Sequence, residues 1–230
     1  MGEEMFMMVL TYELDQSWWS ADPILRQRIV NRLRGLLSGE RGEPHFRRGY
    51  RIIRSDSDFM FWLATKEPAS FAEFKQKVME VSLGLARAKY SMFSVYRDSP
   101  YLKPGMALSQ TLESNPLKYL VAYPMSKDPE WYLLDFEERK RIMAEHIGIA
   151  RSHPLSKGVR SYTTYSFGID DQEFVVIYEV EDIAAWSAVT ERLREVRARK
   201  WITNEAPILV GVLTDFAFLE PEEGKNPSII

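Results

Sequence analysis

The sequence predicts an α+β protein that is built as a twofold repeat, and three observations support this. The same order of strand-like and helix-like segments occurs twice along the 230 residues. The helix-like segments carry apolar residues at helical spacing, and turn-forming residues bound the strand-like ones. Prolines and a glycine between residues 100 and 116 separate the two halves. Each half therefore reads as a β-α-β-β-α-β unit. Two such units in tandem are ferredoxin-like, with two helices covering one face of each antiparallel sheet.

The first half begins with a strand and continues into a capped helix. Asp22 is a helix N-cap, and Pro23 takes the first helical position, where its missing N–H is not needed. Gly39 ends this helix. The tetrapeptide 55–58, Ser-Asp-Ser-Asp, forms a turn between two strands. The predicted elements are strands at 5–12, 49–54, 59–64 and 90–96, and helices at 22–39 and 70–89.

The second half repeats this order. Asp135 and Glu138 match a capping box at the start of a helix. The tetrapeptide 168–171, Gly-Ile-Asp-Asp, connects two strands that pair with each other. The predicted elements are strands at 118–125, 159–167, 173–179 and 207–218, and helices at 135–151 and 183–200.

The composition excludes several classes of site. With 45% hydrophobic and 13% aromatic residues, the chain can build a substantial core. The net charge is −3, and acidic and basic residues are mixed along the chain, so the sequence does not indicate a basic surface that would bind nucleic acid. Because the sequence has no cysteine, disulfides, iron–sulfur clusters and thiolate-ligated metals are excluded. Glu3 and Glu4 stand where a signal peptide would carry basic residues, and no long apolar run follows. We therefore expect a soluble, cytoplasmic protein that binds no membrane.

Three motifs in the second half carry a resemblance to a known family. Residues 123–127 read Tyr-Pro-Met-Ser-Lys, and residues 128–132 read Asp-Pro-Glu-Trp-Tyr. The predicted helix that follows contains Glu138-Arg139 and, later, Met143-Ala-Glu-His146. These motifs resemble the chlorite dismutase and coproheme decarboxylase superfamily of heme proteins, over about residues 117–211 and more loosely before them. The resemblance implies the same fold, usually assembled as a homopentamer, with heme (coproheme or heme b) as the cofactor.

The resemblance also assigns roles to parts of the chain. Residues 1–99 are expected to form a scaffold unit, residues 100–116 a linker, and residues 117–230 the heme-binding unit. Pairing of the two units would leave the other face of the second sheet, opposite its helices, free to form a pocket.

The chain has three histidines, of which His146 is the candidate iron ligand. His45 lies in a predicted loop, and His153 follows a helix end, where a cation favours the helix dipole. His146 shares a helical stripe with Ile142 and Ile149, so spacing alone is equally typical of a core histidine. Neutral imidazole is a common ligand of heme iron. The match to the family's proximal position favours His146 as that ligand.

A proximal histidine usually has a partner for its second ring nitrogen. The family uses a carboxylate on the later helix or in the turn after it. Glu195 is the carboxylate in the otherwise basic segment 193–200, although a solvated helix residue is an equal reading. Arg197 falls near the propionate-binding arginine of the decarboxylases.

The strand at 118–125 and the residues after it provide the other predicted contacts. Tyr123 shares a strand face with Met125, which is expected to contact the cofactor. A core tyrosine is the alternative for Tyr123. The resemblance implies instead that a Tyr123 radical takes hydrogen from a heme propionate, so that loss of carbon dioxide leaves a vinyl group. Lys127, otherwise a loop lysine, pairs with a propionate in the family. Trp131 and Tyr132 would supply apolar surface to the porphyrin or to a subunit contact.

The distal position separates this chain from both groups of relatives. Ser161 stands where chlorite dismutases have arginine and many decarboxylases have glutamine. Arg160 is adjacent, but on a strand it points to the opposite face. A fixed cation at this position would stabilise an anion leaving the iron. Because serine carries no charge, efficient chlorite turnover is not expected.

The predicted function is that of a heme-dependent oxidoreductase resembling coproheme decarboxylase, which uses hydrogen peroxide to convert coproheme propionates and yield heme b. The first alternative is a chlorite dismutase-like or peroxidase-like heme b protein acting on peroxide or an oxyanion. A non-catalytic heme carrier or sensor is the second. A dimeric interaction module without heme is the third.

Overall fold

Both halves of the chain place strands and helices in the predicted order, and the α+β class is confirmed. The structure is a computed structural model that describes residues 4–38, 44–97, 99–101 and 108–221. The first half contributes β1 (Met5–Leu14), α1 (Gln16–Ser20), α2 (Pro23–Leu37), β2 (Phe46–Ile52), β3 (Phe59–Thr65), α3 (Ala69–Val81) and β4 (Ala86–Tyr96). The second contributes α4 (Leu108–Glu113), β5 (Tyr119–Lys127), α5 (Glu130–Leu133), α6 (Phe136–Ser152), β6 (Val159–Tyr165), β7 (Phe174–Val180), α7 (Ile183–Arg192), β8 (Ile202–Asn204) and β9 (Leu209–Leu213). Short 3₁₀ turns are η1 (Pro154–Ser156), η2 (Leu193–Glu195), η3 (Arg197–Trp201) and η4 (Ala217–Leu219).

Two predicted helices end earlier in the structure, and the predicted end of a third is not tested. The helix predicted at 70–89 ends at Val81, because Leu83 (φ 54°) and Gly84 (φ 78°) adopt the left-handed conformation that terminates helices. The helix predicted at 183–200 ends as α7 at Arg192 and continues as η2 and η3. Gly39, predicted to end the first long helix, lies outside the described residues, and α2 itself ends at Leu37.

The capping box predicted for α6 is not formed. Asp135 precedes α6 but makes no side-chain capping bond within the described part of the chain. Glu138 pairs instead with Arg141 at 2.8 Å and with Arg197 at 2.6 Å. Both arginines lie outside the first turn, so ion pairing has replaced the reciprocal capping contact.

The strands of both halves join into one barrel rather than two separate sheets. Going round it, each neighbour is antiparallel, in the order β4, β1, β3, β2, β9, β5, β7, β6 and back to β4. The strands in the described ranges thus close an eight-stranded antiparallel barrel. The last contact, between β4 and β6, rests on the pair Val95 and Tyr165. β8 extends the sheet at the end of β5.

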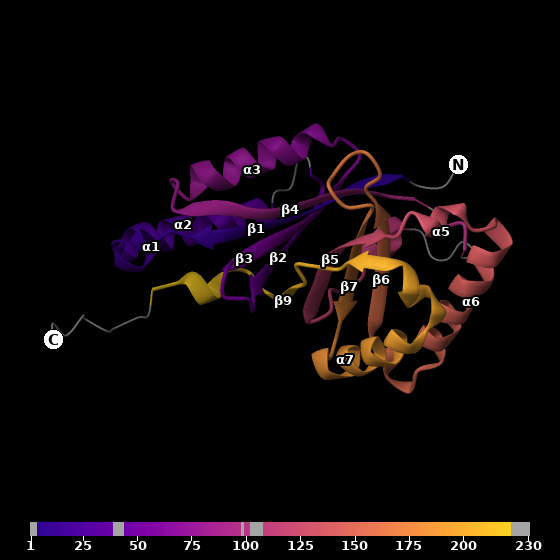
Figure 1. The fold of residues 1–230 in the computed structure, drawn as a ribbon. Helices are drawn as coiled ribbons and strands as arrows, with labels where there is room; N and C mark the ends of the chain where they lie inside the picture. Colours follow the sequence, from indigo (N-terminus) through magenta and orange to yellow (C-terminus); the bar gives the residue numbers. More distant parts are fainter. Residues whose placement is uncertain (1–3, 39–43, 98, 102–107, 222–230) are drawn as a thin grey trace.

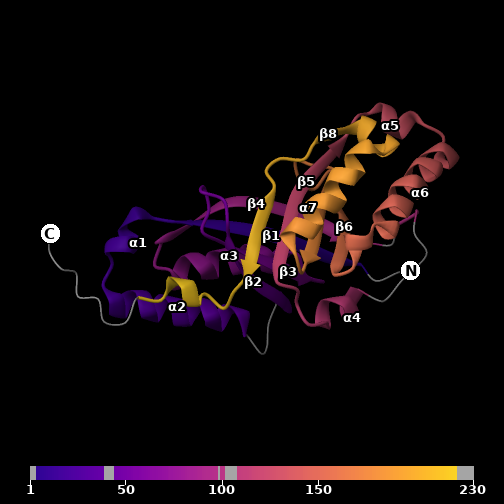
Figure 2. The same ribbon diagram turned by 90° about the horizontal axis from the view of Figure 1, so that it is seen from below.

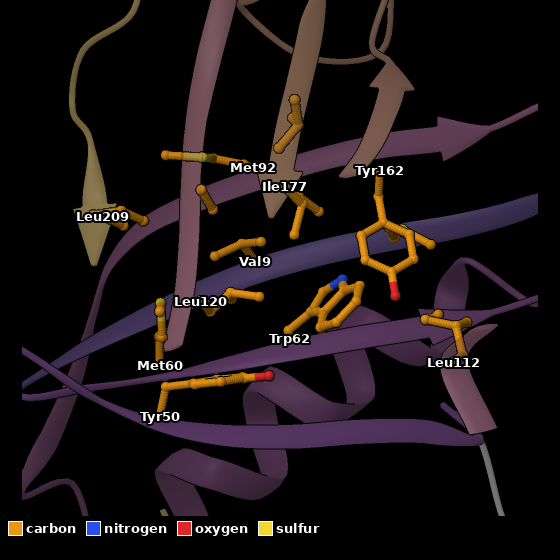
Figure 3. Packing of buried hydrophobic residues seen from close by; sticks show 14 of the residues in the cluster. Val9, Tyr50, Met60, Trp62, Met92, Leu112, Leu120, Tyr162, Ile177 and Leu209 are labelled. Carbon is orange, nitrogen blue, oxygen red and sulfur yellow. The ribbon is translucent and has the colours of Figure 1, made fainter. Parts of the chain in front are cut away.

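The interior of the barrel is a filled apolar core. Alternate residues of each strand point into it, as Figure 3 shows for Trp62 on β3, Tyr162 on β6 and Ile177 on β7. The indole of Trp62 lies 5.0 Å from the Tyr162 ring, centroid to centroid. The face of the second sheet that was expected to be free for a pocket is therefore occupied, because it packs against strands of the first half.

A buried charge network fixes one end of the barrel to the connection between the halves. Glu179 on β7 is fully buried and pairs with Arg48 on β2. Its second oxygen accepts from the Tyr162 hydroxyl at 2.8 Å. Arg48 also donates to the carbonyl oxygens of Leu112 at 2.7 Å and Ser114 at 2.9 Å. Because each group has partners, the cost of burying these charges is offset.

The helices cover the outside of the barrel in two layers. Figures 1 and 2 show α2 and α3 at one end of the molecule and α6 and α7 at the other. The chain after β9 crosses to the first layer, where Phe216 and Leu219 complete its core. Arg34 of α2 holds this segment through Glu220 at 2.5 Å. None of the helices in the described ranges is long and apolar enough to cross a membrane.

Candidate functional site

A cavity of about 130 Å³ lies between the outer face of the second half's strands and the α6–α7 layer. The pocket was predicted on the opposite sheet face, so its position is a correction to the sequence analysis. A larger hollow of about 440 Å³ lies over β1 and β4, but its lining contains none of the motif residues. The cavity is lined by Tyr123, Met125, Lys127, Met143, His146, Thr163, Val176, Tyr178, Trp186, Thr190, Leu193, Arg194, Val196, Ala198, Arg199, Ile202 and Glu205.

His146 reaches the cavity from the third turn of α6. Its Nδ1 is buried and has no hydrogen-bond partner among the described residues. Burial lowers the pKa of His146, the nearby Lys127 charge lowers it further, and Glu145 opposes both. The imidazole is therefore held neutral near pH 7. A neutral imidazole with an unpaired buried nitrogen is suited to bind a metal or to donate to a partner that arrives with a ligand.

Tyr123 and Met125 point into the same cavity from β5. Their strand neighbours Leu120 and Ala122 point into the barrel, so the predicted alternation is observed. The Tyr123 ring stacks on that of Tyr178 at 6.2 Å. Burial raises the pKa of Tyr123 well above its usual value, and Tyr178 and Glu205 raise it further. Tyr123 therefore stays protonated at neutral pH.

Lys127 is a buried lysine at the end of β5. Its Nζ lies 3.4 Å from the centroid of the Trp131 ring, a cation–π contact. Burial lowers the pKa of Lys127 from 10.5 to about 8, because the Glu173 charge that favours protonation offsets only part of the desolvation. Lys127 remains largely charged at neutral pH and presents that charge to the cavity.

Trp131 and Tyr132 support Lys127 and do not line the cavity. Trp131 is buried and lies 5.4 Å from the Trp201 ring, beneath α6. The Tyr132 hydroxyl donates to Glu173 at 2.6 Å, and the same oxygen accepts from the backbone N–H of Lys127 at 2.8 Å. The porphyrin contact predicted for these two residues stays a prediction.

Arg197 and Glu195 do not join the cavity lining either. Arg197 donates to Glu138 at 2.6 Å on the outer side of α6. Glu195 pairs with Arg192, and its side chain is 65% exposed. Glu145, next to His146 in sequence, is the carboxylate that acts on the His146 pKa. Glu195 therefore does not contact His146 in the described part of the chain.

Ser161 lies on the cavity-side face of β6, next to the lining residues. It is paired across the strands with Tyr178, and its hydroxyl interacts with the Tyr178 hydroxyl. Arg160 points to the opposite face, as expected, where it lies 3.4 Å from Glu179. The distal role of Ser161 stays a prediction, but its side chain is on the face where that role requires it.

Sequence reasoning missed several residues on β7, on α7 and after α7 that complete the cavity lining. Tyr178 lies two residues after Val176 on β7, a spacing that places both on one face. Trp186, Thr190 and Leu193 follow at helical spacing and could have been found in the same way. Arg194, Arg199 and Glu205 could not, because 3₁₀ turns and a short strand bring them together.

Arg194, Arg199 and Glu205 form an ion-paired cluster at the edge of the cavity. Glu205 pairs with Arg194 at 2.7 Å and with Arg199 at 2.5 Å. With Lys127, the charged lining carries three cations and one carboxylate. The cavity thus favours an anionic ligand.

This donor set fits an iron porphyrin with carboxylate substituents. His146 provides an unpaired imidazole, Met125 and Val176 provide apolar walls, and the cations match carboxylates. The volume of about 130 Å³ is smaller than the about 300–1,000 Å³ of most small-molecule sites. A porphyrin therefore needs more room than the cavity offers in this conformation.

Comparisons with known proteins agree with this fold. A profile of the family named chlorite dismutase matches residues 26–214. The coproheme decarboxylase of Mycolicibacterium smegmatis is 27% identical over 164 residues, which cover 69% of this chain and 68% of that protein. A crystal structure named as a putative chlorite dismutase is 46% identical, has a TM-score of 0.85 and aligns over 96% of this chain and 98% of its own. The chlorite dismutase of Candidatus Nitrospira defluvii in complex with imidazole has the same fold, with a TM-score of 0.79 at 23% identity over 94% and 93% of the two chains. Since the family profile spans most of the chain and the whole cavity, the chain belongs to the chlorite dismutase family.

Proposed function

We propose that this chain binds an iron porphyrin through His146 and carries out oxidative decarboxylation of porphyrin propionates with Tyr123 as the redox residue. One observation carries the proposal: Tyr123 and His146 come from different elements and line the same cavity. The family is one of heme enzymes, and the coproheme decarboxylase relative supports this reaction. When bound, the porphyrin iron together with peroxide supplies the oxidising power.

The residues of the chain supply position, charge and a movable proton. His146 is held neutral, which is the form that coordinates iron. Lys127 and the arginines around Glu205 match the carboxylates of the substrate. Tyr123, protonated and buried, can lose an electron and its phenolic proton together. Trp186, Leu193 and Val196 cover it on the helix side and keep water from the radical.

A titration tests the cofactor before any reaction is assayed. Purified protein is titrated with ferric coproporphyrin and, separately, with hemin, and the Soret band is followed. We expect saturation at one porphyrin per chain, with tighter binding of the more anionic coproporphyrin. His146→Ala should change the Soret position and the spin state while costing about 1–3 kcal/mol of stability. An unchanged spectrum would contradict the assignment of His146.

Tyr123→Phe tests the reaction. The variant should bind ferric coproporphyrin about as tightly as the parent, because it lacks only a hydroxyl. After addition of peroxide, mass spectrometry of the extracted porphyrin should show propionate loss for the parent and almost none for the variant. Equal conversion by both proteins would reject Tyr123 as the redox residue. Tight binding without conversion by either would indicate a carrier or sensor.

Chlorite dismutation is the second candidate, because the 46% identical structure bears that name. Ser161 argues against it, since no cation faces the distal side at that position. We expect little oxygen release from chlorite by the hemin-loaded parent and more from Ser161→Arg, because one donor aimed at a developing anion contributes about 10²–10³ in rate. Rapid oxygen release by the parent would place chlorite first.

The assembly is proposed to be a homopentamer, as the family resemblance implies. Light scattering coupled to size-exclusion chromatography of the purified chain measures this directly. A mass of one or two chains would contradict it.

A further inference from the structure

Tyr178 connects Tyr123 to the helix layer. It lies on β7, directly opposite Ser161 of β6 and Val121 of β5. Tyr123 is two residues further along β5, on the diagonal at which long aromatic side chains still meet. The rings of Tyr123 and Tyr178 are nearly parallel, at 26°, with centroids 6.2 Å apart. Each of the two phenols acts on the pKa of the other, and Ser161 also acts on the pKa of Tyr178.

The same Tyr178 ring contacts a tryptophan on its other side. Trp186 of α7 lies 4.2 Å from the Tyr178 ring, centroid to centroid, at 40°. All three aromatic residues line the cavity that contains His146. Tyr178 and Trp186 are both half-buried, and the series runs from the sheet to the helix layer. Ring contacts thus connect Tyr123 to Trp186 through Tyr178.

Oxidation of Tyr123 needs a place for its proton. Because burial keeps the pKa of Tyr123 high, the phenol is protonated before it reacts. A buried phenol that loses an electron becomes a strong acid, so its proton leaves for a base. The carboxylate in the cavity lining is Glu205, whose charge already acts on the pKa of Tyr123.

We infer that Tyr178 and Trp186 form a redox relay with Tyr123, through which an oxidising equivalent that the substrate does not use leaves the cavity. The inference rests on the proposed function, which places the first radical on Tyr123. In the first step the O–H bond of Tyr178 breaks and the O–H bond of Tyr123 forms, so one hydrogen atom moves. In the second step the Trp186 indole gives one electron to Tyr178. The indole N–H proton goes to solvent, and solvent returns one proton to Tyr178. Peroxide at the porphyrin iron is the oxidant for the series, and a solvent reductant such as a phenol or ascorbate restores Trp186.

Radical trapping tests the relay in the hemin-loaded protein. After one equivalent of peroxide and a nitroso spin trap, proteolysis and mass spectrometry locate the adducts. The parent should carry adducts on Tyr123, Tyr178 and Trp186. Tyr178→Phe should keep the Tyr123 adduct and lose the Trp186 adduct, while Trp186→Phe should keep those on both tyrosines.

The matched control is Tyr165→Phe, on the neighbouring strand β6. Tyr165 packs against Phe167 and Phe174 and makes no contact with this series in the described structure. Its variant should leave all three adducts in place. An unchanged Trp186 adduct in Tyr178→Phe would overturn the relay while leaving Tyr123 as the redox residue. A parent without any Tyr123 adduct would instead reject the proposed function.

A measurement without heme tests the Tyr123–Tyr178 link by itself. Carbon-13 labelling at tyrosine Cζ allows each phenol to be titrated by NMR in the ligand-free protein. Burial, the main cause of the raised pKa of Tyr123, remains in Tyr178→Phe, but the contribution of Tyr178 is removed, so that pKa should fall. Tyr165→Phe should not change it. An unaltered Tyr123 titration in Tyr178→Phe would break the first link whatever the porphyrin experiments show.

Discussion

The two helix layers have the same topology but are packed differently, and the candidate site lies in the second. In the first layer, between β3 and the helices, the rings of Phe61 and Phe74 meet at 4.9 Å and those of Phe59 and Phe216 at 5.4 Å. In the second, the equivalent strand β7 presents Val176 and Tyr178 to a cavity. The same fold thus leaves, beside Tyr123 and Tyr178, the space in which the candidate site lies.

The helices themselves differ in how firmly they are held. α2 buries Ile29, Val30 and Leu33, and α3 buries four residues including Phe71 and Phe74. In contrast, α6 buries Ile142 alone among its described residues, and α7 buries Val189. A layer with few buried apolar contacts opens at low free-energy cost. The second layer is thus the part that can move to admit a ligand.

The largest effect is expected from matched leucine truncations in the two layers. Leu63→Ala, in the filled layer, should cost about 2.7–5 kcal/mol of unfolding free energy, because Leu63 is fully buried. Leu193→Ala, at the cavity, should cost about 1 kcal/mol, because Leu193 borders space that already exists. Urea denaturation of both variants measures the difference. Equal costs would contradict the contrast between the layers.

Ligand binding should stabilise the second layer selectively. Hemin at 100 times its dissociation constant should raise the unfolding free energy by about 2.7 kcal/mol. Without ligand, amide hydrogen exchange should be faster in α6 than in α2 and α3, and hemin should slow it in α6 and α7. His146→Ala is the control, in which this slowing should be reduced. If hemin slowed exchange only in α2 and α3, the ligand would bind to the first half of the chain, which would contradict the candidate site.

The order of elements could be predicted from the sequence because it depends on local signals. Helical spacing, the Asp22 cap and the turn at 168–171 each act over a few residues. Closure of the barrel could not be predicted, since the β5–β9 and β2–β9 contacts join residues far apart in sequence. Closure fills the inner faces, and this is why the pocket lies beneath the helices.

The site could be predicted where a motif lies on one regular element. Tyr123, Met125 and Lys127 lie on one strand and His146 on one helix, and all four line the cavity. Arg197 and Glu195, expected from the resemblance, lie in a segment that was predicted to be helical and is in fact two 3₁₀ turns. A change in helix type rotates every later side chain, so Arg194 and Arg199 reach the cavity instead.

A smaller effect on the free energy of unfolding, which depends on pH, is expected when Lys127 is replaced. Below pH 8 the lysine is charged in both the folded and the unfolded chain, and the folded chain bears the cost of burying it. Between about 8 and 10.5 the unfolded chain holds the proton and the folded one does not, so stability rises with pH. Lys127→Met should therefore be more stable than the parent at pH 7, and the gain should vanish above pH 10.5. The pKa change sets an upper limit of about 3 kcal/mol, which loss of the cation–π contact reduces to about 1–2 kcal/mol.

Urea midpoints of parent and variant, measured from pH 6 to 11, provide that comparison. Tyrosines ionise in both proteins above pH 10, and taking the difference removes their contribution. A stability gain that does not change with pH would show that Lys127 is not desolvated.

The smallest effect concerns the starts of the two corresponding helices, α2 and α6. The Asp22 side chain accepts from the backbone N–H groups of Ile24 at 2.8 Å and Leu25 at 3.2 Å. Asp135 precedes α6 in the same way but makes no such bond in the described structure. Asp22→Ala should therefore cost about 1 kcal/mol, the usual contribution of a capping bond. Asp135→Ala should cost about 0.3–0.5 kcal/mol, since it loses only the favourable charge near the helix dipole. Asp→Asn at each position keeps a capping oxygen and removes the charge, so Asp22→Asn should be milder than Asp22→Ala whereas the two Asp135 variants should match. Equal costs for the two alanine variants would mean that α6 is capped in solution, and its start would then be as firmly held as that of α2.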